Sequence, residues 1–188
     1  MGTIVCQTFV SLDGVINHME RWHFDYIDAE SDAIALEQLR HSDALLMGRR
    51  TYEVYAGAWP GREGDYPDLI NALPKYVISS TLSDPTWNNT TVLDTEPIAA
   101  IRRLKEQEDR QILMHGYGPL AKALLAEDLL DELHLWVHPV LAGVGAGEDL
   151  VLQPGLTKEL RLTGTRTLGS GVVILTFDNP ARRPDDKS

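Results

Sequence analysis

Short apolar runs alternate along the chain with stretches of helical period. The apolar runs are rich in β-branched residues, and several are nearly continuous, which is typical of strands that are covered on both faces. They lie at residues 3–10, 44–47, 76–79, 91–93, 111–115 and 132–137. The helical stretches lie at residues 32–39, 51–54, 96–108 and 119–127. Strands that alternate with helices predict an α/β fold with a largely parallel central sheet.

The C-terminal part of the chain has a different pattern. Two strand-like runs, at residues 160–168 and 172–177, are separated by Gly169, Ser170 and Gly171. This spacing predicts an antiparallel β-hairpin, so the sheet as a whole is expected to be mixed. We expect one domain over residues 1–178, a surface loop at 61–67, and a solvated, disordered tail at 179–188.

Composition narrows the class of protein. The 188 residues are 43% hydrophobic and 24% charged, which suits one ordinary globular domain. Cys6 is the single cysteine, so no internal disulfide can form, and its place in an apolar run predicts a buried thiol. The sequence begins without a basic or long apolar segment, so we expect a cytoplasmic protein with no membrane partner. The formal net charge of -11 repels a phosphate backbone, so we expect no nucleic-acid partner.

Glycines follow two of the predicted strands and precede two of the predicted helices. Gly48 stands before Arg49 and Arg50, and unpaired amides at a helix start attract phosphate, while a guanidinium adds a fixed cation. The glycine turn at 116–118 satisfies the relaxed dinucleotide pattern GxGxxA. These turns predict a site for a phosphate-bearing small molecule. A solvated arginine pair is the alternative at the first turn, and the second supports only a general anion site, because its context is not that of a Rossmann fold.

Polar side chains follow two of the strands. Asp13 stands after the first strand, where it either closes a tight turn or points into the crevice in which open α/β sheets bind ligands. Ser79, Ser80 and Thr81 follow the strand at 76–79, where they either satisfy backbone groups of their own turn or meet a ligand.

The strand predicted at 132–137 carries an aromatic, weakly polar face. His134, Trp136 and His138 alternate there with apolar residues. Such a face suits either a partner, which would make the protein a homodimer, or burial against a helix of the same chain. The two histidines would stand about 13 Å apart on a strand, so no metal site is predicted.

Four segments in a fixed order carry a resemblance. They are SLDG near residue 11, LLMGRRTYE near residue 45, KYVISST near residue 75, and the glycine turn before PLAKALL, which LLDELHLWVHPVLAGVGAG follows. Over residues 2–178 the chain resembles the dihydrofolate-reductase-like family, in the branch typified by the C-terminal reductase domain of the riboflavin-biosynthesis protein RibD. The resemblance implies a three-layer α/β/α fold and an NADPH-dependent reductase that transfers hydride to a ribosylaminopyrimidine or pterin-like substrate.

The resemblance also implies roles for individual residues. Asp13 would stand at the substrate side of the nicotinamide, with Asp25 as a candidate proton donor and Trp22 as a candidate ring contact. The GRRT segment and the glycine turn would hold the cofactor pyrophosphate, and the hydroxyl segment the adenosine 2′-phosphate. These cofactor-binding residues are Gly48, Arg49, Arg50, Thr51, Ser79, Ser80, Thr81, Gly116, Tyr117, Gly118, Pro119 and Leu120.

The alternative to this reading is a noncatalytic nucleotide-binding homodimer with the same fold. The zinc deaminases that precede the reductase in bifunctional riboflavin enzymes need an HxE and a PCxxC segment. With one cysteine, this chain cannot contain that half.

Overall fold

The computed structural model describes residues 1–106, 111–151 and 154–182. The chain forms two compact units, the first of residues Met1–Ile4 and Ala33–His115, the second of Val5–Asp32 and Gly116–Ser188. The strand β1 (Thr3–Ser11) and the helix α1 (Ala29–Arg40) contribute residues to both. This division does not test the prediction of one domain over residues 1–178.

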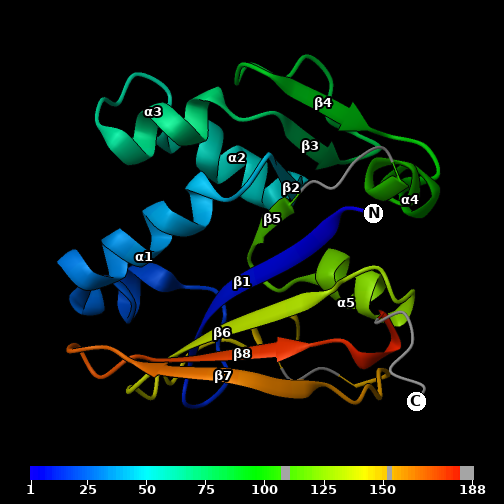
Figure 1. Cartoon of the computed structure of the whole chain (residues 1–188). Helices are drawn as coiled ribbons and strands as arrows, with labels where there is room; N and C mark the ends of the chain where they lie inside the picture. Colours follow the sequence, from blue (N-terminus) through cyan, green and yellow to red (C-terminus); the bar gives the residue numbers. More distant parts are fainter. Residues whose placement is uncertain (107–110, 152–153, 183–188) are drawn as a thin grey trace. The chain divides into compact units, whose positions relative to one another are not determined.

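The first unit contains four parallel strands, which hydrogen bonds join in the order β4-β3-β2-β5 (Figure 1). The strands are β2 (Ala44–Gly48), β3 (Lys75–Ile78), β4 (Thr90–Leu93) and β5 (Gln111–His115). The helices are α2 (Arg49–Ala58), α3 (Asp65–Ala72) and α4 (Pro97–Glu106), together with most of α1. Helix α2 packs against β2 and β3.

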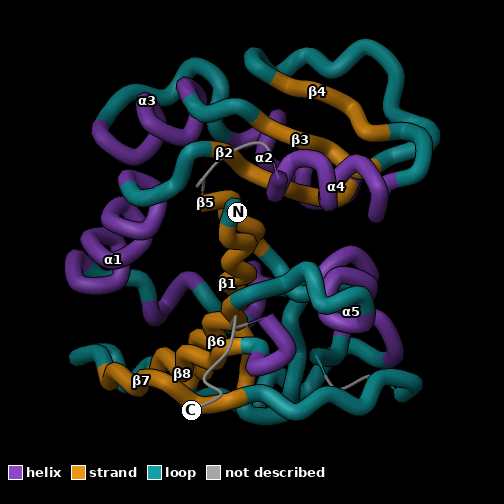
Figure 2. Tube along the Cα trace, turned by 45° about the vertical axis from the view of Figure 1, so that its right-hand side comes forward, coloured by secondary structure: helices purple, strands orange, loops and turns teal. Residues whose placement is uncertain are grey.

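The second unit contains strands in the order β1-β6-β8-β7 (Figure 2). Strand β1 pairs in parallel with β6 (Glu132–His138), whereas β8 (Val173–Asp178) runs antiparallel to both β6 and β7 (Arg161–Thr167). Its helix is α5 (Pro119–Ala126). Short 3-10 turns lie at Met19–Arg21, Phe24–Tyr26, Gly147–Asp149 and Pro180–Arg182.

The predicted fold class is confirmed. The described part of the chain contains eight strands, which form a mixed and mostly parallel arrangement, and its last two strands form the predicted antiparallel hairpin. Cys6 is buried on β1, and burial raises the pKa of its thiol to about 12. No helix of the described residues is long and apolar enough to cross a bilayer.

The predicted surface loop at 61–67 is partly wrong, because α3 begins at Asp65. Gly64, with φ of +122°, ends the turn before it, and Asp65 and Asp68 lie in the first helical turn, where acidic side chains interact favourably with the helix dipole. These charges therefore mark a helix start as well as a solvated surface.

The predicted disordered tail is also wrong at its beginning. Asn179 is buried, and its side-chain amide donates hydrogen bonds to the carboxylate of Asp128 and the carbonyl of Leu130. A 3-10 turn at Pro180–Arg182 follows. Residues 183–188 of the predicted tail lie outside the described residues.

The aromatic face of β6 is not an exposed partner surface. Trp136 and His138 are buried, and Phe9 of β1 packs edge-on against both rings, at 5.5 and 5.6 Å between centroids. Trp22 and Tyr26 also pack edge-on against His138. The chain therefore buries Trp136 and His138 of this face itself, whereas His134 is half-buried, and the homodimer stays a prediction.

A buried ammonium group organises the start of β3. Lys75 has no exposed surface, and its Nζ donates hydrogen bonds to the carbonyls of Asn71, Leu73 and Asn88, at 2.8, 2.7 and 3.2 Å. The same Nζ lies 4.4 Å from the centre of the Trp87 ring. Burial lowers the pKa of Lys75 to about 8, so the ammonium still carries its charge at neutral pH. Its three donors are matched by three acceptors, which ties the end of α3 to the turn before β4.

Replacing this lysine should destabilise the protein. In Lys75→Met the three carbonyls lose their shared donor, and we expect the free energy of unfolding to fall by about 3 kcal/mol. Urea unfolding monitored by circular dichroism measures the loss. The matched control is Lys122→Met, since Lys122 is half-buried and donates to one carbonyl, that of Pro154. Equal losses in the two variants would contradict the structural role of Lys75.

Candidate functional site

Three parallel strands of the first unit end at one edge. In the β2–β3 ladder Gly48 stands opposite Ile78, and in the β2–β5 ladder Leu46 stands opposite Met114. The carboxyl ends of β2, β3 and β5 therefore lie side by side, as ligand-binding edges of open α/β sheets do. The turns that follow these strands carry most of the predicted cofactor residues.

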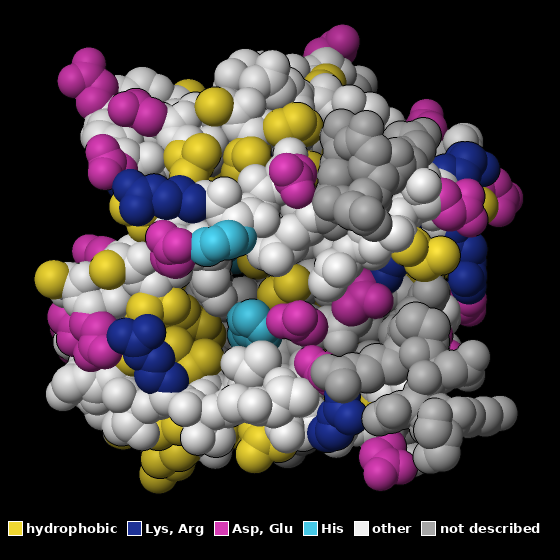
Figure 3. Space-filling model, viewed as in Figure 1, with side chains coloured by type: hydrophobic (Ala, Val, Ile, Leu, Met, Phe, Trp, Pro, Cys, Tyr) yellow, Lys and Arg dark blue, Asp and Glu magenta, His cyan; other side chains and the backbone are white. Residues whose placement is uncertain are grey.

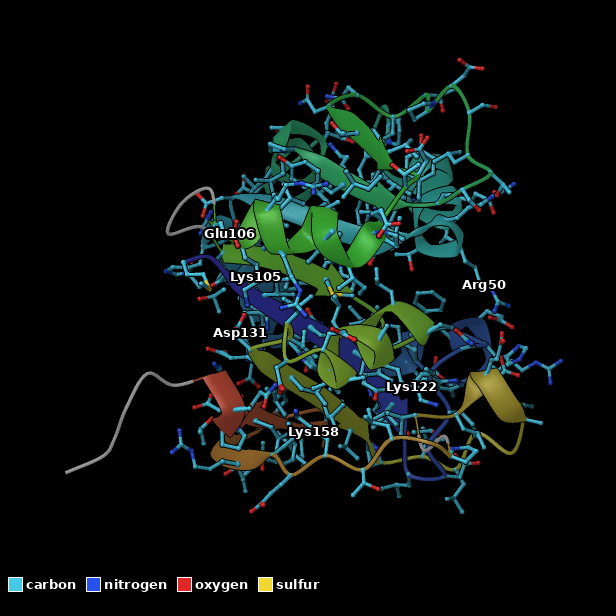
Figure 4. The ribbon with its side chains drawn as sticks, turned by 90° about the vertical axis from the view of Figure 1, so that its right-hand side faces the viewer. Arg50, Lys105, Glu106, Lys122, Asp131 and Lys158 are labelled. Atoms are coloured by element: carbon cyan, nitrogen blue, oxygen red, sulfur yellow. The ribbon has the colours of Figure 1, made fainter. Side chains whose placement is uncertain are left out.

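The first turn leads directly into α2. Gly48 is the N-cap of this helix and is extended, with no side chain capping the free amides. The Arg49 guanidinium is already engaged: it pairs with the Glu53 carboxylate at 2.7 Å and donates to the Thr81 hydroxyl. Arg50 is exposed, no described residue pairs with it, and its side chain extends away from the helix (Figure 4). The start of α2 thus combines uncapped backbone amides with one arginine, Arg50, that has no described partner.

The hydroxyl turn after β3 consists of Ser79, Ser80 and Thr81, and these three predicted residues make different contacts. The buried Ser79 hydroxyl accepts hydrogen bonds from the amides of Thr81 and Leu82, at 3.2 and 3.0 Å, so it holds the turn itself. The Thr81 hydroxyl accepts a bond from Arg49, which links this turn to the start of α2. Ser80 is exposed and has no partner among the described residues.

The second unit contains the other glycine turn. Gly116 has φ of +88°, a conformation that favours glycine, and its amide donates to the carbonyl of Gln7 at 2.8 Å. Its own carbonyl accepts the Cys6 thiol at 3.6 Å. Gly118 then forms the N-cap of α5, with Pro119 as the first helical residue and no side-chain cap. Tyr117 is buried, which raises the pKa of its hydroxyl, and Leu120 follows in the first turn of α5.

Asp13 fastens the loop after β6. Its Oδ1 accepts the Ser11 hydroxyl at 2.6 Å and the Ala142 amide at 2.9 Å, and its Oδ2 accepts the Gly143 amide at 2.8 Å. These bonds, that of Ser11 first, lower the pKa of Asp13 to about 2. Asp13 is therefore ionised at neutral pH and cannot itself supply a proton; its predicted place beside the nicotinamide stays a prediction.

The other two predicted substrate-side residues differ in their exposure. Trp22 is buried, and its indole donates to the carbonyl of Asn17 at 2.8 Å. Asp25 is exposed in the short turn Phe24–Tyr26 and has no partner among the described residues. Their predicted roles as ring contact and proton donor remain predictions.

A histidine pair that sequence reasoning missed lies beside Trp22. His23 Nδ1 and His138 Nε2 are 2.9 Å apart, and His138 Nδ1 lies 2.9 Å from the carbonyl of Trp136. Because a carbonyl only accepts, His138 donates from Nδ1 and accepts at Nε2, so His23 donates from its Nδ1. Phe9 stacks on His23 at 4.0 Å between ring centres. Burial first, and His138 second, lower the pKa of His23 to about 4.

A second pair lies in the first unit. The Tyr55 hydroxyl of α2 and Nδ1 of His115, the last residue of β5, are 2.9 Å apart. Nothing in the spacing of the sequence signals that Tyr55 reaches His115. No group of three or more His, Cys, Asp or Glu that could hold a metal ion occurs in the described ranges.

Comparison with known proteins decides the family. The model of the RibD C-terminal domain matches residues 2–174. The chain belongs to the RibD C-terminal domain family. Two Bacillus subtilis (strain 168) relatives, the uncharacterized proteins YyaP and YwjB, are 26% and 30% identical over 181 and 173 residues. The matches cover 93% of this chain and 93% of YyaP, and 88% of this chain and 91% of YwjB.

Solved structures share the fold. A putative riboflavin biosynthesis protein from Shewanella sp. PV-4 has a TM-score of 0.68 at 18% identity, covering 94% of this chain and 98% of that one. A pyrimidine reductase-like protein from Corynebacterium diphtheriae has a TM-score of 0.68 at 14% identity, covering 94% and 91%. RibD from Acinetobacter baumannii has a TM-score of 0.68 at 15% identity, and the match covers 95% of this chain and 58% of that longer one. The dihydrofolate-reductase-like fold that the sequence implies is thus confirmed.

Each of the two glycine turns, taken within its own unit, has features that suit an anion. In the first unit, a Cβ added at Gly48 would meet no atom within 4 Å, so the space before α2 is open. In the second unit the same is true at Gly116 and Gly118. Each turn precedes a helix whose first amides have no side-chain cap. Acidic side chains are spread over the face seen in Figure 3, so an anion would depend on these local groups rather than on the net charge.

The buried histidine pair makes stability depend on pH. The pKa of His23 is about 4 in the folded protein and about 6.5 when unfolded, so the unfolded chain binds more protons between these values. Stability from this residue is complete above pH 6.5 and is lost as the pH falls towards 4, by on the order of 3 kcal/mol. Urea unfolding at several pH values should show a weaker dependence in His23→Phe than in the parent. His41→Gln, at an exposed histidine, is the control, and a His23→Phe slope equal to the parent's would refute the assignment.

The Asp13 bonds predict a different variant effect. In Asp13→Asn one side-chain oxygen becomes an amide that faces a donor, so we expect a lower melting temperature. Asp25→Asn, at an exposed residue without a described partner, is the matched control and should melt like the parent. Differential scanning calorimetry measures both. If Asp13→Asn melts at the parent's temperature, the loop does not depend on this carboxylate.

Proposed function

We propose that this protein is an NADPH-dependent reductase that transfers hydride to a pyrimidine-ribosyl or pterin-like substrate. The observation that carries the proposal is the start of α2, where uncapped amides lie beside the uncommitted Arg50 and the Arg49–Thr81 bond. Family membership supports it. The name of a Thermotoga maritima protein of this fold, 13% identical, includes a 5-amino-6-(5-phosphoribosylamino)uracil reductase activity.

In this proposal the residues of the chain bind and orient, and the bound NADPH supplies the hydride from its nicotinamide ring. The amides that open α2 and the Arg50 guanidinium bind pyrophosphate oxygens. The hydroxyl turn, with Ser80 exposed and Thr81 held by Arg49, binds the 2′-phosphate. The glycine turn at 116–118 lets the backbone approach the cofactor closely. Asp13 holds its loop as an anion, which leaves Asp25 as the predicted proton donor.

One observation favours a noncatalytic nucleotide-binding role as the second candidate. Asp13, the predicted carboxylate at the nicotinamide, is occupied by three hydrogen bonds and stays ionised. A binding protein needs no proton donor, whereas a reductase that protonates its substrate does. Binding of NADPH without its oxidation in the presence of ribosylaminopyrimidine or pterin substrates would favour this candidate.

Cofactor binding is tested first. Saturating NADPH should raise the melting temperature of the protein, and NADH should raise it less, because only NADPH carries the 2′-phosphate. Arg50→Gln removes one charge-assisted contact and should weaken NADPH binding about tenfold. Arg103→Gln, at an exposed arginine of α4, is the matched control and should bind like the parent. If neither nucleotide shifts the melting temperature, the reductase proposal is wrong.

A further inference from the structure

The Tyr55–His115 pair lies at the edge of the first unit where the proposed cofactor would bind. Extending the β2–β5 register by one residue places His115 beside Met47, directly before Gly48. Tyr55 belongs to α2, the helix that Gly48 opens, and long side chains on a helix lean towards its N-terminus. The tyrosine therefore reaches back from the middle of α2 to a histidine at the level of the helix start.

The surroundings of Tyr55 determine the direction of its hydrogen bond. Trp59 and Trp87 pack edge-on against the Tyr55 ring, at 6.2 and 6.3 Å between centroids. Among the described residues, the hydroxyl has no acceptor other than His115 Nδ1. Burial raises the pKa of Tyr55, so the hydroxyl stays protonated and donates a hydrogen bond to Nδ1 of His115. The neutral imidazole of His115 then carries its own proton on Nε2.

The pair can change its charge without rearranging. When His115 gains a proton, Nδ1 becomes a donor and the hydroxyl oxygen of Tyr55 can accept from it. Nε2 remains a donor in both states. A carboxylate in place of the Tyr55 hydroxyl would favour the charged imidazole at all times. A carbonyl there could only accept, so Nδ1 would always have to carry a proton.

The groups around the pair leave the imidazole neutral until an anion arrives. Tyr66 of α3 interacts electrostatically with Tyr55 and further raises its pKa. The Arg49–Glu53 ion pair lies on the exposed side of α2. No described carboxylate contacts His115, and burial lowers its pKa to about 4. The residue as a whole is half-buried and so keeps some exposed surface.

We propose that His115, oriented by Tyr55, donates a hydrogen bond from its Nε2–H to the pyrophosphate of the bound nucleotide, and that its Nδ1 takes up a proton from solvent when the nucleotide binds. The pyrophosphate is favoured over the 2′-phosphate, because β2 lies between β5 and the strand β3 that leads to the hydroxyl turn. This inference rests on the proposed function, since it requires a nucleotide at the start of α2. Tyr55 is a positioning residue in it.

Calorimetry of NADPH binding at pH 6 tests the proposal. The heat of binding, measured in two buffers of different ionisation enthalpy, gives the protons taken up per nucleotide. We expect uptake by the parent protein, no uptake by His115→Gln, and about tenfold weaker binding by that variant. The matched control His41→Gln removes an exposed histidine of the same unit and should retain the parent's uptake. Tyr55→Phe should bind more weakly but still take up the proton, because the imidazole remains.

A second measurement uses the parent protein alone, so it does not require any variant to fold. Titration of the parent protein, followed through the imidazole signals in its NMR spectrum, should show His115 gaining its proton at higher pH when NADPH is bound. Tight binding without proton uptake, or uptake that persists in His115→Gln, overturns this inference and leaves the reductase proposal standing. Failure of the parent to bind NADPH overturns both.

Discussion

Parallel strand pairing is the constraint on which the candidate site of the first unit depends. Because β2 pairs in parallel with both β3 and β5, the turns that leave these three strands all start at one edge. The chain uses that edge to open α2 at Gly48, to place the hydroxyl turn after Ile78, and to end β5 at His115. An antiparallel neighbour would have sent one of these turns to the opposite edge. The Arg49–Thr81 hydrogen bond then joins two turns that are 32 residues apart in sequence.

Desolvation explains why the buried ionisable groups differ in their state. Lys75 retains its charge because three carbonyls and the face of Trp87 replace its water. The imidazoles of His23 and His115 meet only another histidine or a hydroxyl, which do not compensate for burial of a cation, so both remain neutral. Asp13 is exposed, and its charge is stabilised by the groups that donate to it. The same chain therefore contains a structural cation, a structural anion and two neutral pairs.

These assignments shape the functional hypothesis. The acidic composition provides no general attraction for a nucleotide, so a phosphate-bearing ligand must be bound by a few local groups. The start of α2 offers such groups, and Arg50 is the guanidinium there that no described residue has already paired. The carboxylate predicted at the nicotinamide accepts three hydrogen bonds within its own loop, so in the proposed reductase another group would have to supply the proton.

The sequence by itself determined the elements and their order. Alternating apolar runs, glycine turns and the Gly169–Gly171 spacing predicted the parallel strands and the C-terminal hairpin, because periodicity and turn chemistry are local properties. The local pattern was ambiguous at Asp65, because acidic residues occur both in surface loops and in the first turn of a helix. The prediction of a loop over residues 61–67 was therefore wrong from Asp65 onwards. Only the tertiary structure decided which side chains share a hydrogen bond. Nothing in the spacing relates Tyr55 to His115, His23 to His138, or Lys75 to the Asn88 carbonyl, since strand register and helix packing bring these groups together.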